Sequence, residues 1–163
     1  MADKLTKEHR SWNMSRIRSK DTKPEFVVRS MLHRAGFRFR IHDKKLPGTP
    51  DIVLPKYKAV IFVHGCFWHR HENCKDATTP STRKEFWETK FAKNVKHDEE
   101  VRARLENLGW KSLIIWECMV MKTPELVVDF VKQELGLNFN LPLRRIDKKE
   151  ILKVAEERFD KYH

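Results

Sequence analysis

The feature that most constrains the fold of this chain is a stretch of eleven residues, 64–74, which holds three histidines, two cysteines and an adjacent Phe-Trp pair. The preceding residues, 57–63, form an apolar run with β-branched valines that predicts a buried strand. The side chains of residues 64–74 should therefore emerge at the carboxyl end of a strand. In α/β sheets, functional sites gather at that end.

Part of this stretch has the spacing of a structural metal site. Cys66, His71 and Cys74 follow a C-x4-H-x2-C pattern, and Cys118 comes shortly after another predicted strand, 110–116. Three cysteines and one histidine form a closed Cys3His set that suits tetrahedral zinc. The alternative is three reduced, buried cysteines beside solvated histidines, because only the fold can bring Cys118 close to the others. A disulfide is disfavoured, since three cysteines leave one unpaired and no secretory segment is visible.

The chain is basic, with a formal net charge of +11 and a pI of about 9.7. Residues 7–45 carry twelve Lys and Arg against four Asp and Glu, so this end supplies +8 of that charge. A basic end of this size favours a polyanionic partner, bound with strong salt dependence. Five Trp and ten Phe add to this interpretation, because aromatic side chains among basic ones can stack on bases or wedge between them. A solvated basic face without a partner is the alternative.

The length of 163 residues fits one domain with a core of its own. We expect an N-terminal DNA-binding arm at residues 1–20, a main domain at 21–136 and a helical C-terminal extension at 137–163. No signal peptide and no apolar run near the ~20 residues of a membrane span are visible. The chain is therefore predicted to be soluble and cytoplasmic, or associated with the nucleoid if it is bacterial.

The order of the predicted elements indicates an α/β fold. Thr22 and Glu25 form a capping box that opens a helix, which Gly36 ends. The later elements are a half-buried strand at 37–42, an antiparallel hairpin of strands at 51–54 and 57–63, a helix at 84–108 with a break near Asn94, a strand at 110–116, and a helix at 123–136. Together they predict a mixed central sheet flanked by helices, with Asp51 near His64.

The residues around Asp51 resemble the active-site layout of the restriction-endonuclease-like fold. In that superfamily, a Pro-Asp on one strand and a Glu-x-Lys on the next hold magnesium at a scissile phosphate. Here Pro50 precedes Asp51, but residues 62–64 are Phe-Val-His, so the second acid and the lysine are both missing. A longer series of blocks, all in order, resembles the very short patch repair (Vsr) endonuclease family over residues 10–136. These blocks are Asn13-Met14, Thr22-x-Pro24-Glu25, residues 46–51 (LPGTPD), residues 64–69 (HGCFWH), Arg83-x-Glu85-Phe86-Trp87, Lys93-Asn94, Gly109-Trp110 and Trp116-Glu117-Cys118.

The resemblance implies a magnesium-dependent enzyme that nicks one DNA strand on the 5′ side of the thymine in a T:G mismatch. This lesion is left when 5-methylcytosine deaminates, and the nick starts very short patch repair. The implied partner is double-stranded DNA, acted on by a monomer because the substrate is asymmetric, with mismatch-repair proteins as further candidate partners. Two alternatives stay open: a nuclease of the same fold with another DNA target, and a zinc-stabilised DNA-binding module without catalysis.

The same resemblance implies the catalytic residues. Asp51 would be the carboxylate ligand of magnesium, helped by the backbone carbonyl of Val63. His69 would act as general base or orient the attacking water, because imidazoles titrate near neutral pH. His64 would stand where the superfamily has lysine and contact the phosphate or a metal-bound water. Glu25 would orient water or an imidazole.

Six further residues are expected to read the mismatch: Phe67, Trp68 and Trp87 from the major groove, Met14 from the minor groove, and Lys90 and Asn94 at the mispaired bases. A wedge of this kind must unstack the bases, which is easiest at a mispair. The alternative is that Phe67 and Trp87 are simply core aromatics. In this scheme zinc is the scaffold that fixes the wedge, and magnesium is the catalytic ion.

Overall fold

The computed structural model describes residues 20–137 without a gap, together with Thr6, Glu8, His9, Trp12, Ser15, Arg18, Lys149 and Lys153. Much of the predicted arm and most of the predicted C-terminal extension therefore lie outside the described residues, as does Met14. The division into arm, domain and extension stays a prediction. Among the described residues, no helix combines the length and the apolar character needed to cross a membrane.

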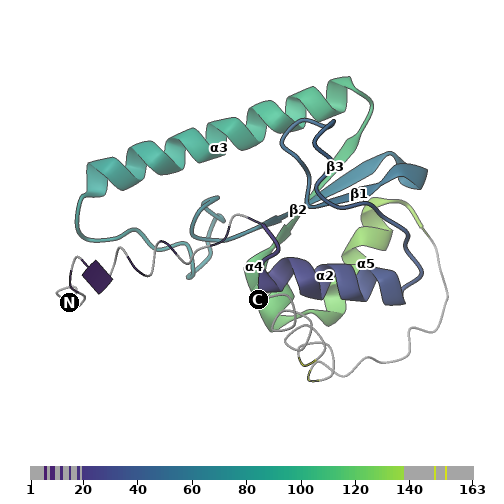
Figure 1. Ribbon diagram of the computed structural model, residues 1–163, viewed down its shortest axis with the longest axis horizontal. Helices are drawn as coiled ribbons and strands as arrows, with labels where there is room; N and C mark the ends of the chain where they lie inside the picture. The colour runs from purple at the N-terminus through teal and green to yellow at the C-terminus, as the bar shows by residue number, and fades with distance from the viewer. Residues whose placement is uncertain are drawn as a thin grey trace.

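A mixed sheet forms the centre of the described chain, with strands β1 (Ile52–Leu54), β2 (Ala59–His64) and β3 (Lys111–Trp116) in the order β1-β2-β3 (Figure 1). β1 and β2 are the predicted antiparallel hairpin, which turns through a short 3-10 helix, η1 (Pro55–Tyr57). β2 and β3 run parallel, with His64 opposite Trp116 in the last pair of the register. Both strands therefore deliver the residues that follow them to the same edge of the sheet.

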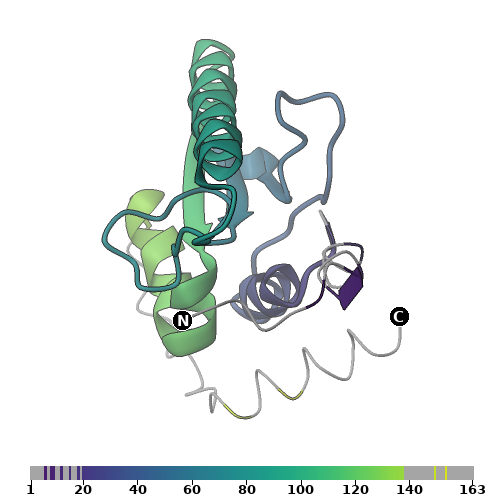
Figure 2. The same cartoon turned by 90° about the vertical axis from the view of Figure 1, so that its left-hand side faces the viewer.

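Helices cover both faces of the sheet. α3 (Lys84–Asn107) lies along one face, while α2 (Lys23–Arg34), α4 (Glu117–Lys122) and α5 (Glu125–Glu134) lie on the other (Figures 1 and 2). Alternation along the strands divides the core in the same way. Ile61 packs with side chains of α2, α4 and α5, whereas Val53 and Val60 pack against Val101 and Leu105 of α3. The predicted mixed α/β architecture is thus confirmed.

The predicted strand at residues 37–42 is wrong. This segment makes only one isolated bridge, between Arg40 and Val53, along the free edge of β1. β1 has just three residues, and His42 leaves the extended conformation with a φ of 47°. The sequence alternates here, but Ile41 is 48% exposed, so the alternation marks an irregular edge segment rather than a half-buried strand.

Two helices also differ from the prediction. α3 is continuous, with no break near Asn94, because that side chain donates to the Trp68 carbonyl oxygen and leaves the backbone of the helix intact. The predicted helix at 123–136 is preceded by an unpredicted one, α4, which begins directly after β3. This extra helix matters for the site, since it carries Cys118.

Candidate active site and metal centre

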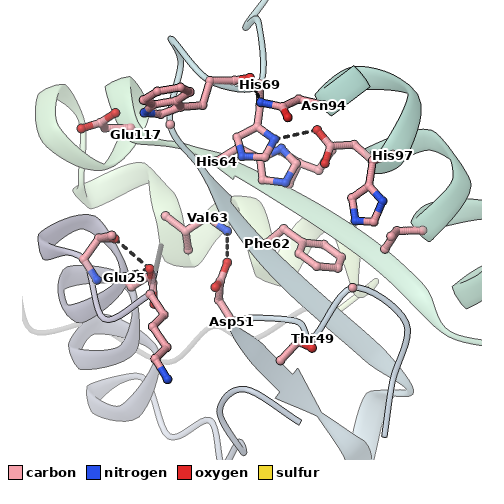
Figure 3. Close-up of a pocket in the computed structure, with 18 of the residues that line it drawn as sticks. Glu25, Thr49, Asp51, Phe62, Val63, His64, His69, Asn94, His97 and Glu117 are labelled. Carbon is pink, nitrogen blue, oxygen red and sulfur yellow. Dashed lines mark hydrogen bonds and ion pairs between the residues drawn. The ribbon is translucent and has the colours of Figure 1, made fainter. Parts of the chain in front are cut away.

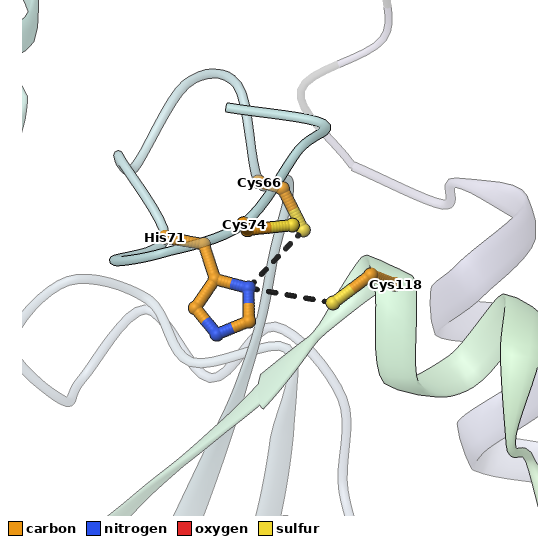
Figure 4. A group of neighbouring side chains, drawn as sticks. All are labelled: Cys66, His71, Cys74 and Cys118. Carbon is orange, nitrogen blue, oxygen red and sulfur yellow. Dashed lines mark hydrogen bonds between the residues drawn. The ribbon is translucent and has the colours of Figure 1, made fainter. Parts of the chain in front are cut away.

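The loop after β2 and the start of α4 meet at a cluster of three cysteines and one histidine (Figure 4). The donor atoms of Cys66, His71, Cys74 and Cys118 all lie within 4.8 Å of one another. His71 Nδ1 is 3.6 Å from the Cys66 sulfur and 3.3 Å from the Cys118 sulfur. The parallel register explains why Cys66 and Cys118 meet. His64 and Trp116 form the last β2–β3 pair, and each cysteine comes two residues after one of them.

The donor set of this cluster fits a zinc ion. Three sulfurs and one imidazole nitrogen are the donors of closed tetrahedral sites, in which metal–sulfur bonds of about 2.3 Å place two sulfurs about 3.8 Å apart. Burial raises the pKa of the Cys66 thiol to about 12, so this sulfur stays protonated unless a cation compensates its charge. The His71 ring stacks on Trp116, with centroids 4.1 Å apart and planes 8° from parallel. The structure thus brings the predicted ligands together, and the identity of their metal is a proposal.

A cleft of about 820 Å³ lies next to this loop, between the start of α2, the segment before β1, the end of β2, and α3 (Figure 3). Its walls carry every predicted catalytic residue and several of the predicted DNA contacts: Glu25, Asp51, Val63, His64, Trp68, His69, Lys90 and Asn94. Basic side chains surround them, among them Arg18, Lys20, Lys44 and Arg102. A cleft with this charge suits a phosphate backbone.

Asp51 lies immediately before β1 and faces the end of β2 (Figure 3). Its Oδ2 accepts a 2.7 Å hydrogen bond from the backbone amide of Val63. Because a strand residue points its amide and its carbonyl to the same side, the Val63 carbonyl lies on the same edge of β2 as the amide that binds Asp51, beyond the last pair that β1 makes. Burial and, second, the charge of Glu25 raise the pKa of Asp51 to about 6. A carboxylate and a carbonyl in a site that disfavours a lone negative charge fit a hard divalent cation.

His64 and His69 stack on each other in the cleft, with ring centroids 3.8 Å apart and planes 13° from parallel. His64 is only 7% exposed, and burial together with the nearby His69 lowers its pKa to about 4, so it is neutral at physiological pH. His69 is more open, and its Nδ1 lies 2.6 Å from Oδ2 of Asp98 on α3. Asp98 therefore sets the orientation of the His69 ring and leaves its Nε2 outside this contact.

The group of His64, His69 and Asp98 does not fit a metal ion, although its donor atoms are close together. The lone pair of an imidazole lies in the plane of the ring, so two stacked rings direct their lone pairs along parallel lines and not toward one point. The arrangement suits proton transfer by a histidine–aspartate pair instead. Sequence reasoning missed Asp98, yet its position one helical turn after Asn94 was a usable signal.

Glu25 lies in a cluster of polar side chains at the start of α2. Its carboxylate accepts from the backbone amides of Asp21 and Thr22, as part of the capping box, and pairs with Arg29 at 2.7 Å. The imidazole beside it is that of His42, at 3.3 Å, and not that of a predicted catalytic histidine. With both carboxylate oxygens engaged, Glu25 is held in place. No sequence pattern predicted this cluster.

Two of the predicted wedge residues, Phe67 and Trp87, pack against one buried ring, that of Phe91. Phe67 packs edge-on against Trp87 and Phe91, with centroids 5.5 and 5.1 Å away, and Phe91 is 5% exposed. Phe67, Trp68 and Trp87 are half-buried. The Lys90 amine lies 5.0 Å from the centre of the Trp68 ring. Phe91 is therefore the core aromatic of this group, while the three wedge residues keep exposed surface.

A family model described as DNA mismatch endonuclease Vsr matches residues 2–76 of the chain. Among curated proteins, the type II nicking enzyme V.XorIIP of Xanthomonas oryzae pv. oryzae is 47% identical over 118 residues, which cover 72% of this chain and 86% of the relative. The type II nicking enzyme V.NmeAIP of Neisseria meningitidis is 46% identical, with 72% and 84% covered. The DNA mismatch endonuclease Vsr of Escherichia coli is 44% identical over 135 residues, with 83% and 86% covered.

Proposed function

This chain belongs to the Vsr family of DNA mismatch endonucleases, and from that premise we propose that it nicks one strand of duplex DNA on the 5′ side of the thymine in a T:G mismatch. The observation that carries the proposal is a basic cleft that holds Asp51 and the His69–Asp98 pair together with Trp68. The nick would start repair of a deaminated 5-methylcytosine. Because the substrate is asymmetric, we expect one copy of the chain to act on it, in the cytoplasm.

Asp51 and the Val63 carbonyl would hold a magnesium ion, since both offer the hard oxygen donors that this ion requires. When bound, magnesium supplies positive charge that stabilises the phosphate and the departing oxygen. The Val63 amide keeps Asp51 in place through Oδ2. In the metal-free chain the pKa of Asp51 is about 6, so protons compete with a cation for this carboxylate in mildly acidic solution. Activity should therefore fall as the pH drops below neutral.

His69 is the proposed general base. Asp98 accepts a hydrogen bond from Nδ1–H at 2.6 Å, which leaves Nε2 to take a proton from the attacking water. The Asp98 carboxylate also stabilises the imidazolium that forms. His64, stacked at 3.8 Å, is neutral, so it adds no positive charge that would oppose protonation of His69. We assign His64 a hydrogen bond to the phosphate.

Phe67, Trp68 and Trp87 are the proposed mismatch readers. Their rings contact one another, so the group would enter the base stack as one rigid wedge. Opening a base step costs about a few kcal/mol and least at a mispair, so such a wedge favours T:G over T:A. Lys90 and Asn94 line the cleft beside Trp68, which supports their contact with the mispaired bases.

Zinc is proposed as a scaffold and not as a catalyst. Its ligands would be Cys66, His71, Cys74 and Cys118. These residues close the loop that carries Phe67, Trp68 and His69, and they tie this loop to α4. Closed zinc sites of this kind contribute folding energy directly. The wedge and His69 would thereby be held at a fixed distance from each other.

A strand-labelled duplex assay tests the proposed function. We expect a nick only in the thymine strand, only in the T:G duplex, only with magnesium, and not with Asp51→Ala. A matched T:A duplex is the control for the mismatch, and omission of magnesium is the control for the ion. Nicking that survives Asp51→Ala would refute the assigned site.

The same assay separates the two alternatives. Equal cutting of T:A and T:G duplexes would indicate a nuclease of the same fold with another target. Salt-sensitive binding without any product, in several sequence contexts, would indicate a DNA-binding module in which the carboxylate and the histidines serve recognition.

A further inference from the structure

Arg29 is a buried arginine that the mechanism above does not use. It lies inside α2 and is 8% exposed. Its Nη1 donates to Oδ1 of Asp21 at 2.7 Å, and its Nη2 donates to Oε2 of Glu25 at 2.7 Å. Nη2 also lies 2.9 Å from Nε2 of His42, which accepts there because a guanidinium can only donate. One cation thus joins residue 21, α2 and residue 42.

Glu25 contacts the same junction between residue 21 and α2. Its carboxylate oxygens accept from the backbone amide of Asp21 at 3.0 Å, the amide of Thr22 at 3.2 Å and the Thr22 hydroxyl at 2.9 Å. Asp21 has a left-handed backbone with a φ of 54°, so the chain bends sharply before it enters α2. Glu25 and Arg29 together therefore hold the backbone and the side chain of the residue at which the predicted arm joins the domain.

The junction between residue 21 and α2 forms part of the catalytic cleft. Lys20, Thr22 and Glu25 line the cleft that holds Asp51, and so does Arg18 from the described part of the arm. The base of the arm thus brings basic side chains to the cleft wall. A basic segment that is already held in one direction binds phosphates without first losing conformational freedom.

The Arg29 guanidinium is oriented toward both Asp21 and Glu25, although this leaves one of its own donors without a hydrogen bond. Its Nε is buried and has no hydrogen-bond partner within the part of the chain that the structure describes. A buried donor without a partner weakens folding. The guanidinium is nevertheless turned so that its two terminal nitrogens reach Asp21 and Glu25 at once. An ion pair that served only the helix would need Glu25 alone.

We propose that Arg29 is a positioning residue that holds Asp21, and with it the base of the arm, at the wall of the catalytic cleft, so that arm and cleft bind DNA as one surface. This inference rests on the proposed function, since the ligand is the same duplex DNA. Loss of the Arg29–Asp21 contact should weaken DNA binding. In Asp21→Asn, which keeps the ion pair between Arg29 and Glu25, the rate of nicking at saturating DNA should stay nearly unchanged.

The test uses the full chain and two measurements. Fluorescence anisotropy without magnesium gives Kd for a labelled T:G duplex, and nicking with magnesium gives kcat and KM. We expect Arg29→Gln to raise Kd and KM about tenfold and Asp21→Asn to raise them about threefold, with kcat of Asp21→Asn within about twofold of the parent value. The double variant should bind about as well as Arg29→Gln, because both changes remove the same contact.

Two comparisons separate positioning from bulk charge. Asp21→Asn removes a negative charge, which by bulk electrostatics alone strengthens DNA binding, whereas loss of the contact weakens it. Asn also tolerates the left-handed backbone at this position. Lys111→Gln is the matched control for Arg29→Gln, because it removes a cation that pairs with Glu134 at 3.1 Å outside the cleft. It should change Kd by less than about twofold.

Amide hydrogen exchange gives a readout other than binding. The amides of Asp21 and Thr22 donate to Glu25, so we expect them to exchange faster in Arg29→Gln than in the parent chain. Parental affinity in both variants would overturn the inference. So would a loss of kcat and thermal stability in Arg29→Gln while Asp21→Asn binds DNA as tightly as the parent.

Two further outcomes are also decisive. If Arg29→Gln does not fold, the sign of the change in Kd for Asp21→Asn decides alone, because that side chain is more exposed than Arg29. If the parent chain binds duplex DNA and the expected shifts in Kd appear, but no T:G duplex is cut, then the proposed function fails and the role of Arg29 stands.

Discussion

Asp51→Asn should make the metal-free protein more stable, even though it removes the proposed ligand of the catalytic ion. The variant side chain has nearly the same shape, and its carbonyl oxygen can still accept the bond that the Val63 amide donates at 2.7 Å. What disappears is the negative charge, which burial and the neighbouring Glu25 disfavour. A site arranged for a cation lowers stability when the cation is absent.

The magnitude follows from the pKa of Asp51, which is about 6 in the folded chain against an ordinary value of 3.8. The folded state holds the proton more tightly, so the ionised carboxylate opposes folding in full above pH 6. This opposition disappears as the pH falls from 6 to below 3.8. A pKa difference of about 2 corresponds to roughly 3 kcal/mol, which is an upper bound because Asp51 keeps some exposure to solvent.

Urea unfolding without magnesium, at about pH 8 and about pH 4.5, measures the effect. We expect Asp51→Asn to raise the free energy of unfolding by about 1–3 kcal/mol at the higher pH and by much less at the lower. Added magnesium should stabilise the parent chain and not the variant. An equal gain at both pH values, or a loss at the higher one, would refute the reasoning, since neither follows from removal of a buried charge.

Three further predictions concern the rest of the site. Asp98→Asn should lower kcat about 100-fold or more with DNA affinity unchanged, because an amide favours the wrong His69 tautomer; equal losses in single-turnover rate and affinity would contradict this. Cys118→Ala should lower zinc content and melting temperature together, since three ligands leave the site open; native mass spectrometry that finds the parental zinc content would show that the ligand set is wrong. Trp68→Ala should reduce the preference for T:G over T:A about tenfold in paired nicking rates, because a stacking ring contributes about 1–3 kcal/mol; an unchanged preference would place that ring outside the wedge.

Local sequence signals were sufficient wherever a short segment determines its own conformation. The capping box of Thr22 and Glu25 opens α2, and the two runs around η1 form the hairpin. The predictions failed where a distant partner decides. The alternation at residues 37–42 could not show that this segment makes only one bridge with β1. The helical conformation at Asn94 could not be recognised either, because the hydrogen-bond partner of its side chain, the Trp68 carbonyl, lies in a distant loop.

In the candidate site, too, the sequence grouped the residues that lie close together in the chain. Residue type and spacing were enough to group Cys66, His71 and Cys74, because all three lie in one loop. Asp51 and His69 were singled out by the resemblance of ordered sequence blocks to the Vsr family, and their roles stay a prediction. Chemical preference for a soft or a hard metal is a property of the side chains themselves, so it can be read before any fold is known.

Only the tertiary structure decided how these side chains are supported. His69 and Asp98 are 29 residues apart in the chain, and the packing of α3 on the sheet places them 2.6 Å apart. The register of β2 and β3 brings Cys118 to the loop that carries Cys66, His71 and Cys74, and the bend at residue 21 sets Asp21 against Arg29. No local pattern encodes these distances, because each depends on how separate elements pack. The sequence by itself indicated which metals and which reaction its side chains suit, and the packing decided which residues orient them.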